Sequence, residues 1–381
     1  MITYLYWTAI FILTLAPLYI LGFKAVKWKA AVIVASIILL TGWSTYYFRL
    51  QQVFVKRYGG VMTIRVPVLV DYFARPAILN GLMGKISLFI GGPPAAPMFL
   101  AIMGYYIAHQ GHSFRHDVWR GLKLMLLGIG LNVTRNAYSL FNIFAGKSNA
   151  DVWHIVFGTD ILILAGISLV AMALVIKILR GHVLAYLGLI IVFLLLQYVI
   201  PPVEKVLPNA IIIPFFYGKY PQAQFPFIPW FAYVLAGYTF YLFKQFFVAD
   251  QFKHNRTVKV ILGTLSGVLL VVSMPFGYSV SINHTLFYHH GILFFLFCVN
   301  YLFWWLLSAR AIVEKVNNKL TGYFEFIGKN VTAFYVIFMI LAGNMEPFYH
   351  KSMDYLLLGF YFAVLLVVTT LFVRLWERVK G

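Results

Sequence analysis

Two neighbouring apolar stretches of the chain contain side chains that could carry chemistry inside a membrane. Arg135 and Asn136 follow Asn132 by three and four positions, so on a helix the three side chains share one face. The next apolar stretch contains His154 and Asp160. An ionisable group at bilayer depth is costly unless it is paired or faces water, so its presence there marks function by default. These residues predict a polar substrate path in which Arg135 pairs with Asp160. A buried ion pair that only fixes the register of two helices is the open alternative.

A second polar group lies where two apolar stretches reach the same predicted side of the membrane. His289 and His290 open one stretch, and Glu346 and His350 end the other. A His beside a carboxylate can act as a general base, because an imidazole titrates near neutral pH. We expect the base among these three His residues, oriented by Glu346 or by Asp160. The spacing is not diagnostic of zinc, so no metal site is expected.

A third, basic group precedes one of the apolar stretches. Arg115, Arg120 and Lys123 lie near the start of a predicted helix. Cations at a helix start can hold phosphates, helped by the positive end of the helix dipole. The alternative is an ordinary basic loop on the cytoplasmic side. No Walker motif or dinucleotide fingerprint occurs in the chain.

The amino-acid composition indicates which kind of fold positions these residues. The chain has 381 residues, of which 62% are hydrophobic and only 11% charged. Soluble domains carry about a quarter charged residues, so the sequence predicts a polytopic membrane protein that contacts the lipid bilayer. In such a protein the net charge of +19 reports cytoplasmic loops facing anionic lipid. Nucleic acid is therefore not expected as a partner.

The apolar runs predict an all-α fold of about eleven transmembrane helices, forming a single transmembrane domain over residues 1–381. Most Lys and Arg residues fall on one side of these helices, which places the N-terminus outside and the C-terminus in the cytoplasm. Two longer extracytoplasmic loops are expected at 49–87 and 201–225, the second rich in Pro and aromatic residues. The predicted spans are about 2–22, 29–48, 88–108, 121–146, 152–179, 183–200, 226–247, 257–279, 287–308, 328–345 and 354–373.

Several short motifs between about 90 and 345 follow one another in an order that resembles the transmembrane acyltransferase superfamily. The resemblance is to the heparan-α-glucosaminide N-acetyltransferase-like branch and to bacterial family 3 acyltransferase-like membrane proteins. The motifs are AAPMFLAIMG at 95–104, WRGLKLMLLGIGLN at 119–132, FGTDIL at 157–162, FPFIPW at 225–230 and IGKN at 327–330.

The resemblance implies an enzyme of the plasma (inner) membrane that moves an acyl group from cytosolic acyl-CoA to an extracytoplasmic sugar or lipid-linked glycan. It implies that Arg115 and Arg120 hold the phosphates of CoA, and that Asp160 and Arg135 lie near the reaction path. The family carries a His in its first catalytic span, but the corresponding stretch, 28–48, contains none. If the mechanism is kept, the base is expected from His289, His290 or His350.

Two other functions stay open from the sequence. A transporter or flippase would use Arg135, Asp160 and the Pro-interrupted segment near 225–229 as a substrate path. A non-catalytic subunit would dock a partner through the two long loops, and the sequence also allows a homodimer.

The predicted pairing of Arg135 with Asp160 can be tested by a double-mutant cycle. If the two side chains interact, Arg135→Ala and Asp160→Ala should couple by about 0.5–3 kcal/mol in the free energy of unfolding in detergent. Simple additivity of the two changes would exclude the pair.

Overall fold

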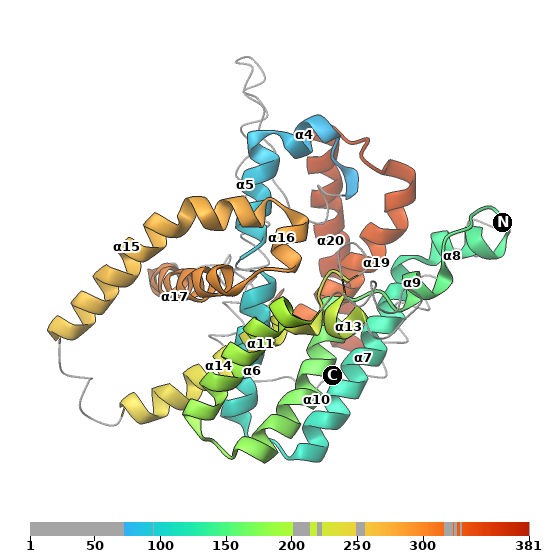
Figure 1. The fold of residues 1–381 in the computed structure, drawn as a ribbon. Helices are drawn as coiled ribbons and strands as arrows, with labels where there is room; N and C mark the ends of the chain where they lie inside the picture. The colour runs from blue at the N-terminus through green and yellow to red at the C-terminus, as the bar shows by residue number, and fades with distance from the viewer. Residues whose placement is uncertain are drawn as a thin grey trace. The chain divides into compact units, whose positions relative to one another are not determined.

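A computed structural model describes residues 72–93, 95–200, 214–218, 223–248, 256–315, 323, 326–327 and 330–380. The predicted spans 2–22 and 29–48 lie outside the described residues, as do most of the predicted loops 49–87 and 201–225. Residues 76–80, 82–91 and 214–217, which lie in or beside those loops, are helical. Helices joined by turns and short connections make up the described part of the chain (Figure 1).

The chain divides into two compact units. Of the described residues, the first unit contains those up to Gly92, Ile129–Val156 and those from Ala309 onward, and the second contains those within Pro93–Gly128 and Phe157–Ser308. Helix α7 (Phe114–Arg135) begins in the second unit and ends in the first, and α17 (Ile292–Lys315) also contributes to both. In the first unit the remaining described helices are α4 (Pro76–Asn80), α5 (Leu82–Gly91), α8 (Ala137–Phe144), α9 (Val152–Val156), α19 (Val331–Tyr349) and α20 (Tyr355–Lys380). In the second they are α6 (Ala96–Gln110), α10 (Ile161–Leu179), α11 (Val183–Val199), α13 (Pro214–Tyr217), α14 (Phe227–Val248), α15 (Arg256–Ser281) and α16 (His284–Tyr288).

The apolar composition of these helices is that of a membrane protein. Among the described residues, four helical segments are long and apolar enough to cross a bilayer, namely Ile161–Leu179, Gly263–Ser281, Val331–Tyr349 and Tyr355–Val379. Shorter apolar helices occur at Val183–Val199, Phe227–Phe243 and Ile292–Trp305. The all-α membrane fold is confirmed at this level, while the eleven spans and their orientation stay predictions.

Four predicted spans are interrupted among the described residues. The span expected at 88–108 divides between α5 and α6, and that expected at 287–308 divides between α16 and α17. The span expected at 121–146 breaks at Asn136, whose backbone has φ −106° and ψ 19°. The side-chain amide of Asn136 donates to Asn132 O at 2.8 Å, and such local bonds compete with the helix ladder. The span expected at 152–179 is two helices, because the carboxylate of Asp160 caps α10 by accepting from the Leu162 amide at 3.0 Å.

Glycines bring helices of the second unit into backbone contact. Helix α14 packs against α6 and α11, and the three lie side by side in Figure 1. A Cβ on Gly104 would lie 1.9 Å from Val234 O, and one on Gly237 would lie 1.8 Å from Ala101 O. Helices α7 and α10 meet in the same way, since a Cβ on Gly166 would lie 2.6 Å from Gly121 O. No side chain fits at these crossings.

We expect Gly237→Ala to destabilise the protein by about 1–3 kcal/mol or to prevent folding, because the new methyl group overlaps backbone that cannot move aside. The matched control is Gly188→Ala in α11, where a Cβ would meet nothing within 4 Å. Thermal unfolding in detergent should show a lower midpoint for the first variant and an unchanged or higher midpoint for the second. Equal midpoints for the two variants would contradict the close packing of α6 and α14.

Candidate functional site

The candidate residues from the sequence divide between the two units. The second unit contains Arg115, Arg120, Lys123, Asp160, His289 and His290, and the first contains Asn132, Arg135, Asn136, His154, Glu346 and His350. Arg135 and Asp160 belong to different units, so their pairing stays a prediction. Each group is described within its own unit.

A His and a carboxylate form a pair at the last turn of α19, in the first unit. Glu346 and His350 are four residues apart, and Nδ1 of His350 donates a hydrogen bond to Oε1 of Glu346. The side chain of His350 is 53% exposed and that of Glu346 is 29% exposed. A carboxylate at Nδ1 fixes the tautomer in which Nε2 is the basic nitrogen. The pair therefore has the composition and the exposure of a general base.

The end of α7 holds this part of α19 in place. The amide of Asn344 donates to Thr134 O at 2.7 Å, and a Cβ on Gly343 would lie 2.6 Å from Arg135 O. Gly343, Glu346 and His350 are three, four and seven residues apart, so they share one face of the helix. Arg135 consequently lies against the same face of α19 that carries the His–carboxylate pair.

Among the other predicted path residues of the first unit, Asn132 and Asn136 bond to backbone carbonyls and His154 bonds to a carboxylate. The amide of Asn132 donates to Val156 O at 3.0 Å, which ties α7 to the end of α9. His154 donates from Nδ1 to Asp151 Oδ2 at 2.6 Å, and both side chains are about half exposed. This bond, together with the Trp153 amide, lowers the pKa of Asp151. Asp151 was not among the predicted residues, although its three-residue spacing from His154 was a usable signal.

His290 has a different role from His350. It is buried, its Nδ1 donates to Phe287 O at 2.7 Å and its Nε2 accepts from the Tyr233 hydroxyl at 2.9 Å. Both ring nitrogens are therefore occupied, and the ring joins the turn before α17 to α14. Trp230 of α14 supports the same turn by donating from Nε1 to Tyr288 O at 2.9 Å. His289, next to it, is half-buried.

Asp160 is buried and serves as the cap of α10 described above. The neighbouring hydroxyl of Thr159 accepts from the Phe225 amide at 3.3 Å. These contacts give Asp160 a structural function in the second unit, and its predicted catalytic function remains untested.

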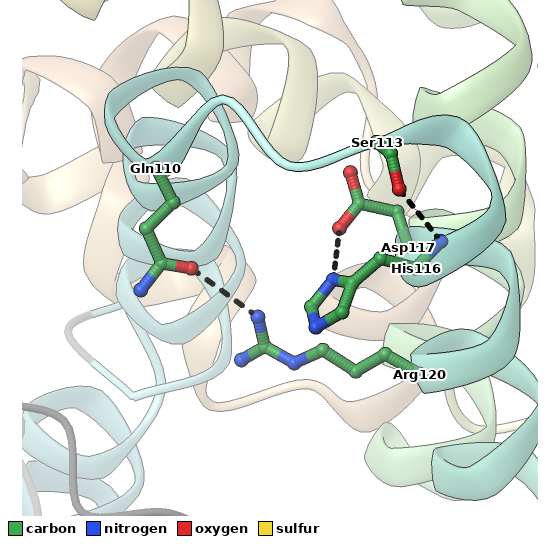
Figure 2. A network of polar contacts seen from close by, with 5 residues as sticks. All are labelled: Gln110, Ser113, His116, Asp117 and Arg120. Carbon is green, nitrogen blue, oxygen red and sulfur yellow. Dashed lines mark hydrogen bonds and ion pairs between the residues drawn. The ribbon is translucent and has the colours of Figure 1, made fainter.

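The basic group at the start of α7 forms a polar network with the end of α6 (Figure 2). Arg120 donates from Nη1 to Gln110 Oε1 at 3.5 Å, and His116 Nδ1 lies 3.4 Å from Oδ1 of the buried Asp117. The His116 amide donates to Ser113 Oγ at 3.4 Å. Asp117 thus offsets part of the positive charge of the network, which we call the α6–α7 network.

The helices that carry the α6–α7 network also carry further cations and aromatic rings. Arg115 is exposed, and the ammonium of Lys123 lies 5.6 Å from the centre of the Trp119 ring. On the α6 side the His109 ring stacks on Tyr105 at 6.4 Å and meets the edge of Tyr241 at 5.5 Å. Cations beside stacked rings provide contacts for phosphates and for a flat base.

No protein-family model, no curated protein and no solved structure matches the chain. The family resemblance of its motifs therefore stays a prediction. Within the part of the chain that the structure describes, no group of three or more His, Cys, Asp or Glu residues could hold a metal ion.

The α6–α7 network should bind phosphate-bearing anions more tightly as the pH falls. His112 lies beside the α6–α7 network, because the centre of its ring is 4.1 Å from that of His116. Burial, His116 and Arg120 lower the pKa of His112 against the opposing effect of Asp117. His112 is therefore neutral at pH 7.5, and it gains a proton only as the pH falls below its unperturbed value near 6.5. Between pH 7.5 and 5.5 the affinity for CoA should rise about two- to fivefold more in the wild type than in His112→Gln. Calorimetric titration measures both, and equal pH profiles would show that His112 does not face the anion.

Proposed function

We propose that the protein is a membrane-embedded acyltransferase that moves an acyl group from acyl-CoA to a hydroxyl or amine of an extracytoplasmic, sugar-containing acceptor. The observation that carries the proposal is the exposed Glu346–His350 pair at the end of α19. A His held by a carboxylate is suited to remove a proton from an alcohol or amine at neutral pH. The proposal places the enzyme in the plasma (inner) membrane.

The α6–α7 network supports the donor half of the proposal. Acyl-CoA presents phosphates and an adenine ring, which Arg115, Arg120 and Lys123 and the rings beside His109 would contact. Burial lowers the pKa of Arg120 and Asp117 raises it, but a guanidinium stays charged at neutral pH. Arg120, fixed by Gln110, would be the preorganised cation, and exposed Arg115 would close on the phosphates.

The reaction requires one proton transfer and one exchange of bonds at the thioester carbon. His350 Nε2 accepts the proton of the acceptor hydroxyl or amine, and Glu346 stabilises the imidazolium that results. The acceptor oxygen or nitrogen bonds to the carbonyl carbon, the C–S bond breaks, and the CoA sulfur takes up the proton. Arg135, on the same face of α19, would stabilise the negative oxygen of the tetrahedral intermediate.

A thermal-shift measurement in detergent with acetyl-CoA and longer acyl-CoAs tests the donor half. The wild type should be stabilised increasingly as the ligand concentration rises, with the logarithmic dependence above the Kd that mass action requires. Arg115→Ala/Arg120→Ala should lose the shift, whereas His350→Gln should keep it and lose acyl transfer. Exposed Lys147→Ala is the control for the loss of a positive charge elsewhere.

Absence of a shift with every acyl-CoA would overturn the proposal in favour of transport or docking. Retention of acyl transfer by His350→Gln would reject His350 as the base and return the choice to His289.

A further inference from the structure

A short backbone pairing follows the Glu346–His350 pair in the first unit. The Lys351 amide donates to Tyr72 O at 2.8 Å, the Met353 amide to Phe73 O at 2.8 Å, and the Arg75 amide to Met353 O at 3.2 Å. Residues Ala74 and Met353 form a parallel bridge. The segment 72–75 is thereby fixed beside residues 351–353, although the two are far apart in the sequence.

Lys351 has a backbone conformation that favours glycine. Its φ is +48°, in the left-handed region, where a side chain is strained and Gly or Asn is preferred. Lys351 is also exposed, so packing gives no reason for a long side chain at this turn. Strain retained at an exposed cation points to a function for the charge.

Arg75 brings a second cation to the same turn. Its Nε donates to Ser352 O at 3.0 Å, and the residue is exposed. The guanidinium thus lies over the segment that contains Lys351 and adjoins His350. Two carboxylates are near in sequence: Glu346 bonds to His350, and Asp354 accepts from the Leu357 amide at 3.0 Å to cap α20. Each carboxylate therefore has its own bond.

We infer that Arg75 and Lys351 form a binding site for a phosphate ester at the end of α19. An arginine offers paired donors that match phosphate oxygens, and a lysine adds a mobile point charge. Lys351 directly follows His350, the residue proposed for proton transfer, in the sequence. The acceptor is accordingly a phosphate-bearing molecule, such as a sugar linked to a lipid phosphate. This last step rests on the proposed function, whereas the binding of phosphate esters does not.

Binding of glycerol 1-phosphate and of farnesyl phosphate to the purified protein in neutral detergent tests the site. The measurement is made in the Arg115→Ala/Arg120→Ala background, so that these two cations at the start of α7 do not contribute to phosphate binding. Lys351→Gly and Arg75→Gln should each weaken binding about tenfold, the loss expected for one charged hydrogen bond. Lys351→Arg should retain binding. Lys147→Gln, which removes another exposed cation, is the matched control.

Lys351→Gly also separates binding from folding, because it relieves the left-handed strain. Its thermal midpoint should be unchanged or higher while its phosphate affinity falls. Tight binding of both phosphates would show a site that recognises the phosphate group alone. Selective binding of farnesyl phosphate would show a site that also recognises the lipid chain. Both outcomes support the inference. Unchanged affinity in Lys351→Gly and Arg75→Gln would overturn it. If the acyl-CoA shift persisted in that case, the proposed acyl transfer would stand with a different acceptor.

Discussion

The contact on which the second unit depends is the crossing of α6 and α14 at Gly104 and Gly237, where backbone meets backbone. Inside a bilayer no hydrophobic force draws helices together, so close van der Waals packing at small residues must do so. The crossing positions chemistry at both ends of the pair. Helix α6 ends at Gln110, which holds Arg120, and α14 begins with Trp230 and Tyr233, which hold the turn at 287–290. A methyl group at either glycine would disturb the network and the turn together.

Hydropathy predicted several described helices closely, because an apolar run of sufficient length in lipid can satisfy its backbone only as a helix. Helix α11 was expected at 183–200 and occupies Val183–Val199. The breaks at Asn136 and before Ile161 were not predicted. They depend on single hydrogen bonds from Asn and Asp side chains to backbone, and a hydropathy average does not register such bonds.

In the candidate site, contacts between residues close in sequence could be predicted, and contacts between distant residues could not. The spacing of Glu346 and His350 already allowed a bond within one helix, and the structure contains it. The environment of His290 could not be read from the sequence, because its partner Tyr233 lies 57 positions away. The pairing of residues 72–75 with 351–353 is equally distant. Arg75 and Lys351 could therefore not be recognised as neighbours before the fold was known.

Burial explains why the His–carboxylate pairs of the first unit lie at helix ends. Its buried amides, Asn132 and Asn344, bond to backbone carbonyls of neighbouring segments, where an amide satisfies a polar group without bringing in a charge. Its His–carboxylate pairs, Asp151–His154 and Glu346–His350, both retain exposure. A base that gains a charge during a reaction is least costly where water or a preorganised counter-charge can stabilise the cation. Glu346 provides that counter-charge and His350 retains access to solvent. In the proposed reaction, a substrate at this helix end would therefore meet a His whose Nδ1 is already held by the Glu346 carboxylate.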